Sequence, residues 1–449
     1  MSRSQPDIES RLAAILPRLQ QVALAGSPAV VRGRVRRLLG TIVHATVAEV
    51  RVGEICHLVD PATRQRVAAE VIGFTEEMAV LTPVGDLGGL SNGAEVIPSG
   101  DVLRIAVGRC LLGRVINALG EPMDGGPWAD DQIEAFHPVD AEPPSPLTRA
   151  IIEHPIQLGI PAIDGLLTCA RGQRVGIFGG PGLGKSTLLG DIVRSTDADV
   201  VVVALIGERG REVGEFVEQQ LGQAGRARSV VIATTSDRPA MERVKAAHTA
   251  MTVAEFFRDS GRHVLLLMDS LTRFARAQRE IGLAAGEPPT RRGYPPSIFA
   301  ALPRLVERVG PTAHGSITGL YTVLVEGDLS LDPIAEEVQA LLDGHVILST
   351  ELAQRNHFPA IDVLRSRSRL MSAVVPPEQR AAAARVRELL ARYADVELLV
   401  RVGEYKSGSD PLADEAIAKI DQINGFLRQR PSAQQTIEET RRQLREIVR

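Results

Sequence analysis

The segment VGIFGGPGLGKSTLL, residues 175–189, limits the possible fold of this chain more than any other part of its sequence. An apolar run typical of a buried strand leads into a glycine-rich loop with the spacing Gly179-x-x-x-x-Gly184-Lys185-Ser186, and a helix pattern follows. Backbone N–H groups of such a loop wrap phosphates, Lys185 reaches the terminal phosphates and the Ser186 hydroxyl binds Mg²⁺. The order strand, loop, helix therefore predicts a P-loop in a parallel α/β sheet.

The residues predicted to bind nucleotide in this loop are Gly179, Gly180, Pro181, Gly182, Leu183, Gly184, Lys185, Ser186 and Thr187. Further along the chain, HVLLLMD is another apolar run, and it ends in Asp269. A carboxylate at the C-terminal end of a core parallel strand suits a water-mediated contact with Mg²⁺. Taken alone, Asp269 could equally be the N-cap of the next helix. Together with the P-loop, it predicts that the chain binds Mg-nucleotide.

Hydrolysis also needs a group that orients or deprotonates the attacking water. The apolar run VVVALIG is followed directly by Glu208 and Arg209, which are candidates for polarising water and for holding phosphate charge. A salt bridge within the loop, shared with Arg211 and Glu212, is an equally good interpretation of this segment. Arg273, four residues after Asp269, could face the same site, although a surface position is commoner for a helical arginine.

Composition excludes several other classes of protein. The net charge of −4 comes from nearly balanced acidic and basic totals, and aromatic residues make up only 3% of the chain, which disfavours a nucleic-acid-binding surface. The three cysteines are widely spaced and form no disulfide or zinc pattern. We find no run of 18 apolar residues and no secretory signal, so we expect a protein of the reducing cytosol.

Hydrophobic periodicity divides the chain into four regions. Residues 1–26 carry a short amphipathic helix pattern, and residues 27–100 contain short β-rich runs that predict a compact barrel. Residues 101–375 alternate strand and helix patterns, which is typical of a parallel α/β core. Residues 376–449 contain three helix patterns with apolar residues at intervals of three and four.

The segments around the P-loop, Glu208 and Asp269 form part of a wider resemblance. With GRCLLGRVINALGEPMDGGP, GLAAGEPPTRRGYPPSIFAALPRLVERVG and GSITGLYTVLVEGD, they closely resemble the catalytic subunits of rotary F- and V-type ATPases. The ATPases of bacterial type III secretion and flagellar export are the most similar relatives. The resemblance covers almost the whole chain. It implies a RecA-like P-loop core with an N-terminal β-barrel and a C-terminal helical domain, in a homohexamer that hydrolyses Mg-ATP.

The resemblance also implies roles for individual residues. Lys185 and Ser186 match the P-loop pair of the family, Glu208 matches its catalytic glutamate, and Arg209 matches the phosphate-binding neighbour of that glutamate. Asp269 matches the carboxylate at the strand end. Non-catalytic sister subunits of rotary ATPases lack the glutamate, so Glu208 indicates a catalytic chain.

The segment HFPAIDVLRSRSRLM, which begins at residue 357, resembles two further elements of the family. Phe358 falls where relatives have an aromatic ring on the adenine, although it could simply be a core residue, and Tyr405 could close the other side of the base. Arg369 falls on the arginine finger, which reaches the γ-phosphate held by the next subunit. Arg365 and Arg367 have no counterpart, and alternation in an extended segment predicts that they share a face with Arg369 or are solvated.

The resemblance extends to the system that the chain serves. The barrel segment EVIGFTEEMAVLTPVGDLGGLSNGAEVIPSG is more similar to the injectisome members than to the flagellar ones. Implied partners are a stator protein, a coiled-coil central stalk protein, chaperone–effector complexes that the enzyme releases and unfolds, and the export gate. The implied location is cytoplasmic, at the cytoplasmic face of the inner membrane, with no nucleic acid expected. A flagellar export ATPase and a proton-coupled rotary subunit are the alternatives.

Overall fold

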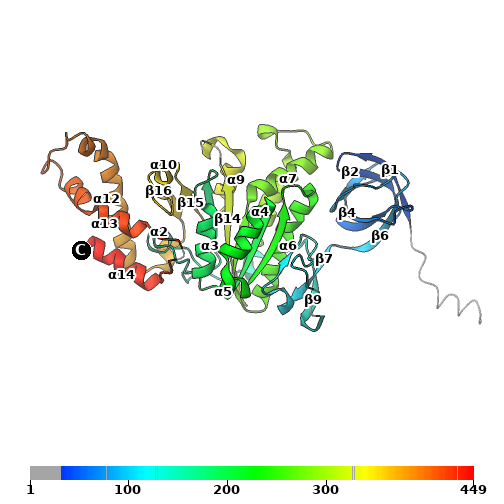
Figure 1. The fold of residues 1–449 in the computed structure, drawn as a ribbon, viewed down its shortest axis with the longest axis horizontal. Coiled ribbons are helices and arrows are strands. Elements are labelled where there is room, and N and C mark those ends of the chain that lie inside the picture. The colour runs from blue at the N-terminus through cyan, green and yellow to red at the C-terminus, as the bar shows by residue number, and fades with distance from the viewer. Residues whose placement is uncertain are drawn as a thin grey trace, which may run out of the picture. The chain divides into compact units, whose positions relative to one another are not determined.

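The computed structural model describes residues 32–76, 78–126, 128, 130–325, 327, 329–431 and 433–449. Two compact units divide this part of the chain (Figure 1). The smaller contains the described residues up to Pro83 together with Leu87–Asp101, and the larger contains Val84–Asp86 and Val102–Arg449. The N-terminal segment 1–26, with its predicted helix, lies outside the described residues.

The smaller unit is a closed antiparallel barrel with the strand order β1-β2-β5-β4-β3-β6 (Figure 1). Its strands are β1 (Gly33–Leu39), β2 (Ile42–Thr46), β3 (Glu54–Val59), β4 (Arg66–Thr75), β5 (Met78–Pro83) and β6 (Glu95–Val102). Val67, Ala69 and Val71 of β4 are buried, and the residues between them are more exposed. This alternation is what a strand with one face toward a barrel core requires. The barrel predicted from the sequence is confirmed.

The larger unit is built on a sheet with the strand order β16-β15-β10-β14-β13-β11-β12-β8. The strands are β8 (Val115–Ile116), β10 (Arg174–Gly179), β11 (Val200–Glu208), β12 (Ser229–Thr235), β13 (His263–Asp269), β14 (Ser316–Leu324), β15 (Gly344–Leu348) and β16 (Ile361–Ser368). All neighbours pair in parallel except β15 with β16. A separate antiparallel pair consists of β7 (Arg104–Gly108) and β9 (Ile133–Pro138). The predicted α/β core is confirmed.

Helices cover both faces of this sheet. Every residue of β11 is buried, as expected for a central parallel strand. Val201 and Val203 share a core cluster with residues of α3, and α6 packs against β11, β12 and β13. The helices between the strands are α2 (Pro161–Leu166), α3 (Lys185–Ser195), α4 (Gly210–Glu215), α5 (Gly222–Ala227), α6 (Ala240–Asp259), α7 (Leu271–Ala284), α8 (Pro296–Val306), α9 (Pro333–Leu341) and α10 (Thr350–Gln354), and the short helix α11 (Met371–Val374) follows the last strand.

The chain ends in three helices, α12 (Pro377–Arg401), α13 (Pro411–Leu427) and α14 (Ile437–Val448), which match the three predicted helix patterns. They pack on one another and on α2, and their apolar residues belong to the same core cluster as the sheet. Thr436 and Glu439 form a capping box at the start of α14. The predicted boundary at residues 375 and 376 therefore falls inside the larger compact unit and stays a prediction. No described helix combines the length and apolarity needed to cross a bilayer.

A buried ion pair joins α6 to the segment after α8. The Arg308 side chain is almost fully buried, and its Nη2 and Nε atoms donate to the Glu255 carboxylate at 2.6 and 2.8 Å. Its Nη1 donates to the backbone oxygen of Val139 at 3.0 Å. Removal of one partner from such a pair leaves a buried charge without compensation.

We therefore expect Arg308→Ala to destabilise the larger unit by about 3–5 kcal/mol, because Glu255 loses its counter-charge in a dry environment. Chemical denaturation followed by circular dichroism measures the loss. Arg304→Ala, at an exposed position of α8, is the matched control and should leave the unfolding midpoint unchanged. A loss below about 1 kcal/mol for Arg308→Ala, the range of a surface pair, would contradict this view of the pair.

Candidate active site

The predicted P-loop joins the end of β10 to the start of α3. Gly184 precedes the first residue of α3 and has φ +78°, a left-handed conformation that glycine adopts without strain. A Cβ atom at Gly184 would lie 3.4 Å from the ring of Phe358, so that ring packs against the loop. Both the backbone angle and the close approach of the ring favour glycine at this position.

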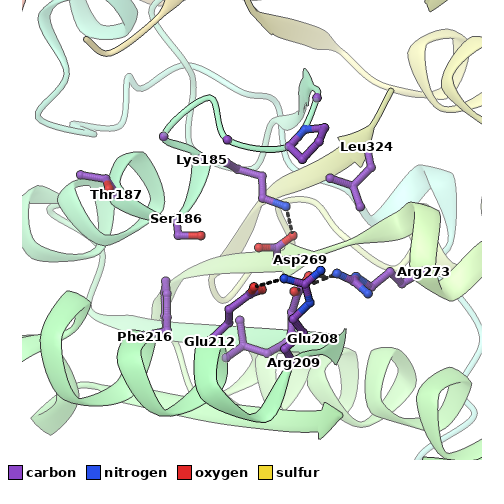
Figure 2. Close-up of a pocket in the computed structure, with 15 residues that line it drawn as sticks. Lys185, Ser186, Thr187, Glu208, Arg209, Glu212, Phe216, Asp269, Arg273 and Leu324 are labelled. Atoms are coloured by element: carbon purple, nitrogen blue, oxygen red, sulfur yellow. Dashed lines mark hydrogen bonds and ion pairs between the residues drawn. The ribbon is translucent and has the colours of Figure 1, made fainter. Parts of the chain in front are cut away.

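Lys185 and Asp269 form an ion pair in the pocket beside this loop (Figure 2). Lys185 Nζ donates to Asp269 Oδ1 at 2.7 Å, and the Thr322 hydroxyl of β14 donates to the same oxygen at 2.6 Å. Asp269 is buried at the end of β13, whereas Ser270 is the N-cap of α7 and accepts a hydrogen bond from the Arg273 backbone. The alternative role of Asp269 as an N-cap is therefore not found.

Glu208 ends β11 and faces Arg273 of α7 (Figure 2). Arg273 Nη2 donates to Glu208 Oε2 at 3.0 Å, and Arg273 Nε lies 3.0 Å from Oε1. Gly207, with φ +64°, lies where the pairing of β11 with β12 becomes irregular, and a Cβ atom there would lie 3.2 Å from the Arg243 side chain. This turn of the backbone directs the Glu208 side chain to the pocket.

Three effects raise the pKa of Glu208 to about 7: burial of its carboxyl group, then the negative charge of Asp269 and, as the smallest, a side-chain hydrogen bond with Glu212. The positive charges of Arg273 and Lys185 act in the opposite direction. A carboxyl group with this pKa changes charge near neutral pH, which suits a group that accepts a proton from water.

Arg209 extends from the same loop and is mostly exposed. Its Nη1 lies 3.4 Å from Glu212 Oε1, so part of the salt bridge considered from the sequence is present (Figure 2). An exposed pair of this kind contributes about 0–1 kcal/mol, and a phosphate group can therefore displace it.

These side chains surround a cavity of about 410 Å³, within the range of small-molecule sites (Figure 2). The lining residues are Gly180, Pro181, Gly182, Gly184, Lys185, Ser186, Thr187, Leu205, Glu208, Arg209, Glu212, Phe216, Asp269, Arg273 and Leu324. A second cavity of about 630 Å³ shares Gly180 and Pro181 with the first and is lined also by Gly179, Leu183 and Arg365. The fold thus brings most of the predicted site together.

Three predicted residues lie elsewhere. The Tyr405 hydroxyl donates to Asp414 and to the backbone oxygen of Asp410, between α12 and α13, and its side chain does not line either cavity. Phe358 lies against Gly184 rather than in the lining of the first cavity. Arg369 follows β16, where its backbone N–H donates to the Asp343 oxygen just before β15.

Sequence analysis missed Thr322, whose hydroxyl shares Asp269 Oδ1 with Lys185. Its position inside the apolar strand β14 was the available signal, because a buried hydroxyl needs a partner. Phe216 and Leu324 also line the pocket, but nothing in their local sequence distinguishes them from core residues.

In the described part of the chain, no group of three or more His, Cys, Asp or Glu side chains could hold a metal ion by itself. The pocket nevertheless offers the Ser186 hydroxyl and the Asp269 carboxylate, which are hard oxygen ligands. Mg²⁺ binds through one or two such protein groups together with phosphate oxygens and water. The residues present therefore fit Mg²⁺ delivered with a nucleotide.

A parallel sheet with a P-loop after one strand and carboxylates at the ends of two others defines a P-loop nucleotide hydrolase. Comparison with known proteins agrees with this class. Residues 159–368 match the ATP synthase alpha/beta family, nucleotide-binding domain, and residues 375–446 match the T3SS EscN ATPase C-terminal domain. The chain belongs to the type III secretion system ATPases, a branch of that family, and is an enzyme that hydrolyses ATP.

Individual relatives support this assignment. The chain is 55% identical to the type 3 secretion system ATPase of Sinorhizobium fredii, over 92% of this chain and 91% of the relative. It is 46% identical to the flagellum-specific ATP synthase of Bacillus subtilis, over 91% and 93%. The structure of the assembled ATPase EscN from enteropathogenic E. coli matches with a TM-score of 0.88 and 48% identity, and covers 93% of this chain and 100% of that one.

The raised pKa of Glu208 predicts a pH dependence of ATP hydrolysis. With Glu208 as the predicted general base, only its carboxylate form can accept the proton, so kcat/KM should rise with pH and reach half its maximum near pH 7. Arg273→Ala should move this midpoint to higher pH, since loss of the positive charge raises the pKa of Glu208 further. Steady-state kinetics over a pH series measures the midpoint.

The control for this experiment is Arg279→Ala, on the same helix, whose guanidinium lies over the Tyr294 ring and does not line the pocket. It should keep the midpoint of the parent. An unchanged midpoint in Arg273→Ala would show that Glu208 is not the group whose ionisation limits kcat/KM.

Proposed function

We propose that this protein energises type III secretion as a homohexameric, Mg²⁺-dependent ATPase in which Arg369 of each subunit completes the site of its neighbour. The observation that carries the proposal is the position of Arg369. Its side chain is exposed and forms no ion pair with any described residue, although its own subunit contains a complete P-loop pocket.

The length of β10, which separates Arg369 from the P-loop of its own chain, supports a role of Arg369 in another subunit. Gly344 of β15 pairs with Val175 near the start of β10 and with Ser368 of β16. Arg369 therefore belongs to the edge of the sheet where β10 begins, whereas the P-loop follows the other end of that strand. Five residue steps from Arg174 to Gly179 span about 16 Å, more than an arginine side chain covers. An exposed arginine that forms no ion pair among the described residues and lies this far from its own pocket is suited to a phosphate held by an adjacent chain.

Within one pocket, the proposed roles follow from charge. Lys185 and the P-loop N–H groups bind the β- and γ-phosphates, and Lys185 exchanges Asp269 for phosphate when nucleotide enters. Ser186 would hold Mg²⁺ directly and Asp269 through water, and the bound ion would neutralise phosphate charge. Phe358 would contact the adenine from its place beside Gly184.

Glu208 orients the attacking water and accepts its proton as the water oxygen bonds to the γ-phosphorus and the bond to the β-phosphate oxygen breaks. The buried position of Glu208 in the lining of the pocket and its pKa of about 7 support this role, because its carboxyl group can change charge where the water would lie. Arg209 of the same chain would stabilise the negative charge that develops on the transferred phosphoryl group, and Arg369 of the adjacent subunit would do so from the other side of the subunit boundary.

Assembly and partners are proposed from the relatives. One solved structure is that of EscN in complex with its central stalk EscO, with a TM-score of 0.86 to this chain at 47% identity. We infer a homologous coiled-coil stalk here, together with a stator protein, chaperone–effector complexes that the ATPase releases and unfolds, and an export gate at the cytoplasmic face of the inner membrane. Higher identity to the Sinorhizobium secretion ATPase than to the Bacillus flagellar protein favours an injectisome over flagellar export.

Substitution of Glu208 separates binding from hydrolysis. Glu208→Gln should retain ATP binding, because the P-loop is intact, and should lose at least about 10²-fold in kcat, because the amide cannot accept the proton. Lys185→Ala should lose binding and turnover together. Nucleotide titration and steady-state turnover measure the two quantities, and a normal kcat in Glu208→Gln would remove Glu208 from the catalytic role.

The position of Arg369 predicts an asymmetry between two neighbouring arginines. Arg369→Ala should lower kcat by about 10³–10⁵-fold while nucleotide affinity changes little, as for removal of an arginine finger. Arg367→Ala, two residues away and also exposed, is the matched control and should have a much smaller effect. Equal losses in the two variants would contradict the assignment of Arg369.

A further inference from the structure

Strand β16 contains a bulge that includes Arg365 and precedes Arg367 and Arg369. Gly344 and His345 of β15 pair with Ser368 and Arg367, but Ile347 pairs with Asp362. Residues 363–366, here called the β16 bulge, therefore lie opposite a single residue of β15. The sequence left two alternatives for Arg365, a face shared with Arg369 or a solvated position. Arg365 is exposed, belongs to the bulge and lines the second cavity.

The bulge also determines the direction of the residues that follow it. It adds three residues relative to β15, and an odd excess in a strand turns all later side chains to the opposite face of the sheet. Arg367 and Arg369 come directly after it. The face that presents Arg369 thus depends on whether the bulge keeps its shape.

Side chains from two other elements bind the backbone of the bulge. The guanidinium of Arg387, on α12, donates to the Val363 oxygen at 2.8 Å and to the Ser366 oxygen at 3.4 Å from each of two nitrogens. It also donates to the Leu166 oxygen at the end of α2 at 3.1 Å. His345 Nε2 lies 3.1 Å from the Arg365 oxygen. Backbone groups that lose their ladder partners in the bulge are satisfied in this way.

Arg387 is unusual because its charge has no counter-ion. No carboxylate among the described residues pairs with it, although Arg385 and Arg392 on the same helix each pair with acids. Its side chain is partly buried, and burial lowers the pKa of its guanidinium. Partial burial of a cation has a cost in desolvation free energy when its donors bind carbonyl groups and no carboxylate. The carbonyl groups that Arg387 binds belong to the bulge and to α2.

We propose that Arg387 is a positioning residue for hydrolysis: it fixes the β16 bulge and thereby sets the direction in which Arg369 is presented to the adjacent subunit. This inference rests on the proposed role of Arg369 in the neighbour's site. Because Arg387 lies on α12, the C-terminal helical region of one subunit contributes to the active site of the adjacent subunit. Loss of Arg387 should therefore lower ATP turnover in the adjacent subunit's pocket and leave nucleotide binding in its own pocket intact.

Arg387→Gln, which removes the forked donor, should lower kcat by about 10–100-fold, the scale expected for a small misplacement of a catalytic group. Nucleotide affinity and KM should stay within about twofold of the parent, since the P-loop pocket is untouched. Arg387→Lys retains the charge but cannot bridge both carbonyls, and should show a smaller loss of kcat. Arg380→Gln, at an exposed position of the same helix, is the matched control and should behave as the parent.

Mixed assemblies provide the decisive measurement. Lys185→Ala chains are inactive themselves but retain Arg369 and Arg387. When they are mixed before assembly with Arg387→Gln chains, turnover per Arg387→Gln chain should rise, because intact pockets now receive a correctly held arginine. Arg369→Ala chains mixed in the same way should show the same rescue.

Each other outcome has a definite meaning. Rescue of Arg369→Ala without rescue of Arg387→Gln would overturn the inference about Arg387 and leave the shared site intact. Absence of rescue for Arg369→Ala would instead refute the proposed function in trans. A parental kcat in Arg387→Gln, or loss of assembly or of nucleotide binding in both Arg387 variants, would reduce Arg387 to a residue of the fold alone.

Discussion

Parallel pairing of β10, β14, β13 and β11 is the constraint on which the site depends. Because these strands run in one direction, their C-terminal ends meet at the same edge of the sheet, and the residues at those ends come together there. The P-loop follows β10, while Asp269 and Glu208 are the last residues of β13 and β11. Three segments separated by many residues in sequence therefore form one pocket at the ends of buried strands.

The charged side chains of this pocket form three ion pairs. Lys185 neutralises Asp269, and Arg273 neutralises Glu208, while Arg209 keeps only a weak contact at the surface. Burial makes two adjacent carboxylates costly, which is why the pKa of Glu208 is raised. In the proposed mechanism, phosphates entering this site would draw the cations toward themselves and leave the carboxylates for the metal ion and for water.

Sequence could predict the parts of the fold and site that are encoded locally. The P-loop spacing, an acid directly after an apolar strand, and helix periodicity each lie within a short segment, so Lys185, Glu208, Asp269 and the three terminal helices could be predicted. Thr322 and the Arg387 contacts could not, because they depend on which distant backbone lies opposite. The β16 bulge could not be predicted for the same reason: a bulge is defined by two strands, and one strand alone does not reveal it.

Strand β10 also connects the P-loop with the contacts around Arg369. Its last residue leads into the P-loop, while its first, Arg174, donates to the Asp343 carboxylate, and the Asp343 backbone oxygen accepts from the Arg369 N–H. One strand thus has the P-loop at one end and, at the other, the Asp343 contacts that reach Arg369, the arginine that we propose for the next subunit's site. In the proposed hexamer, a movement of this strand along its axis would displace both ends, and nucleotide in one pocket would then be coupled to the position of the arginine that serves the adjacent pocket.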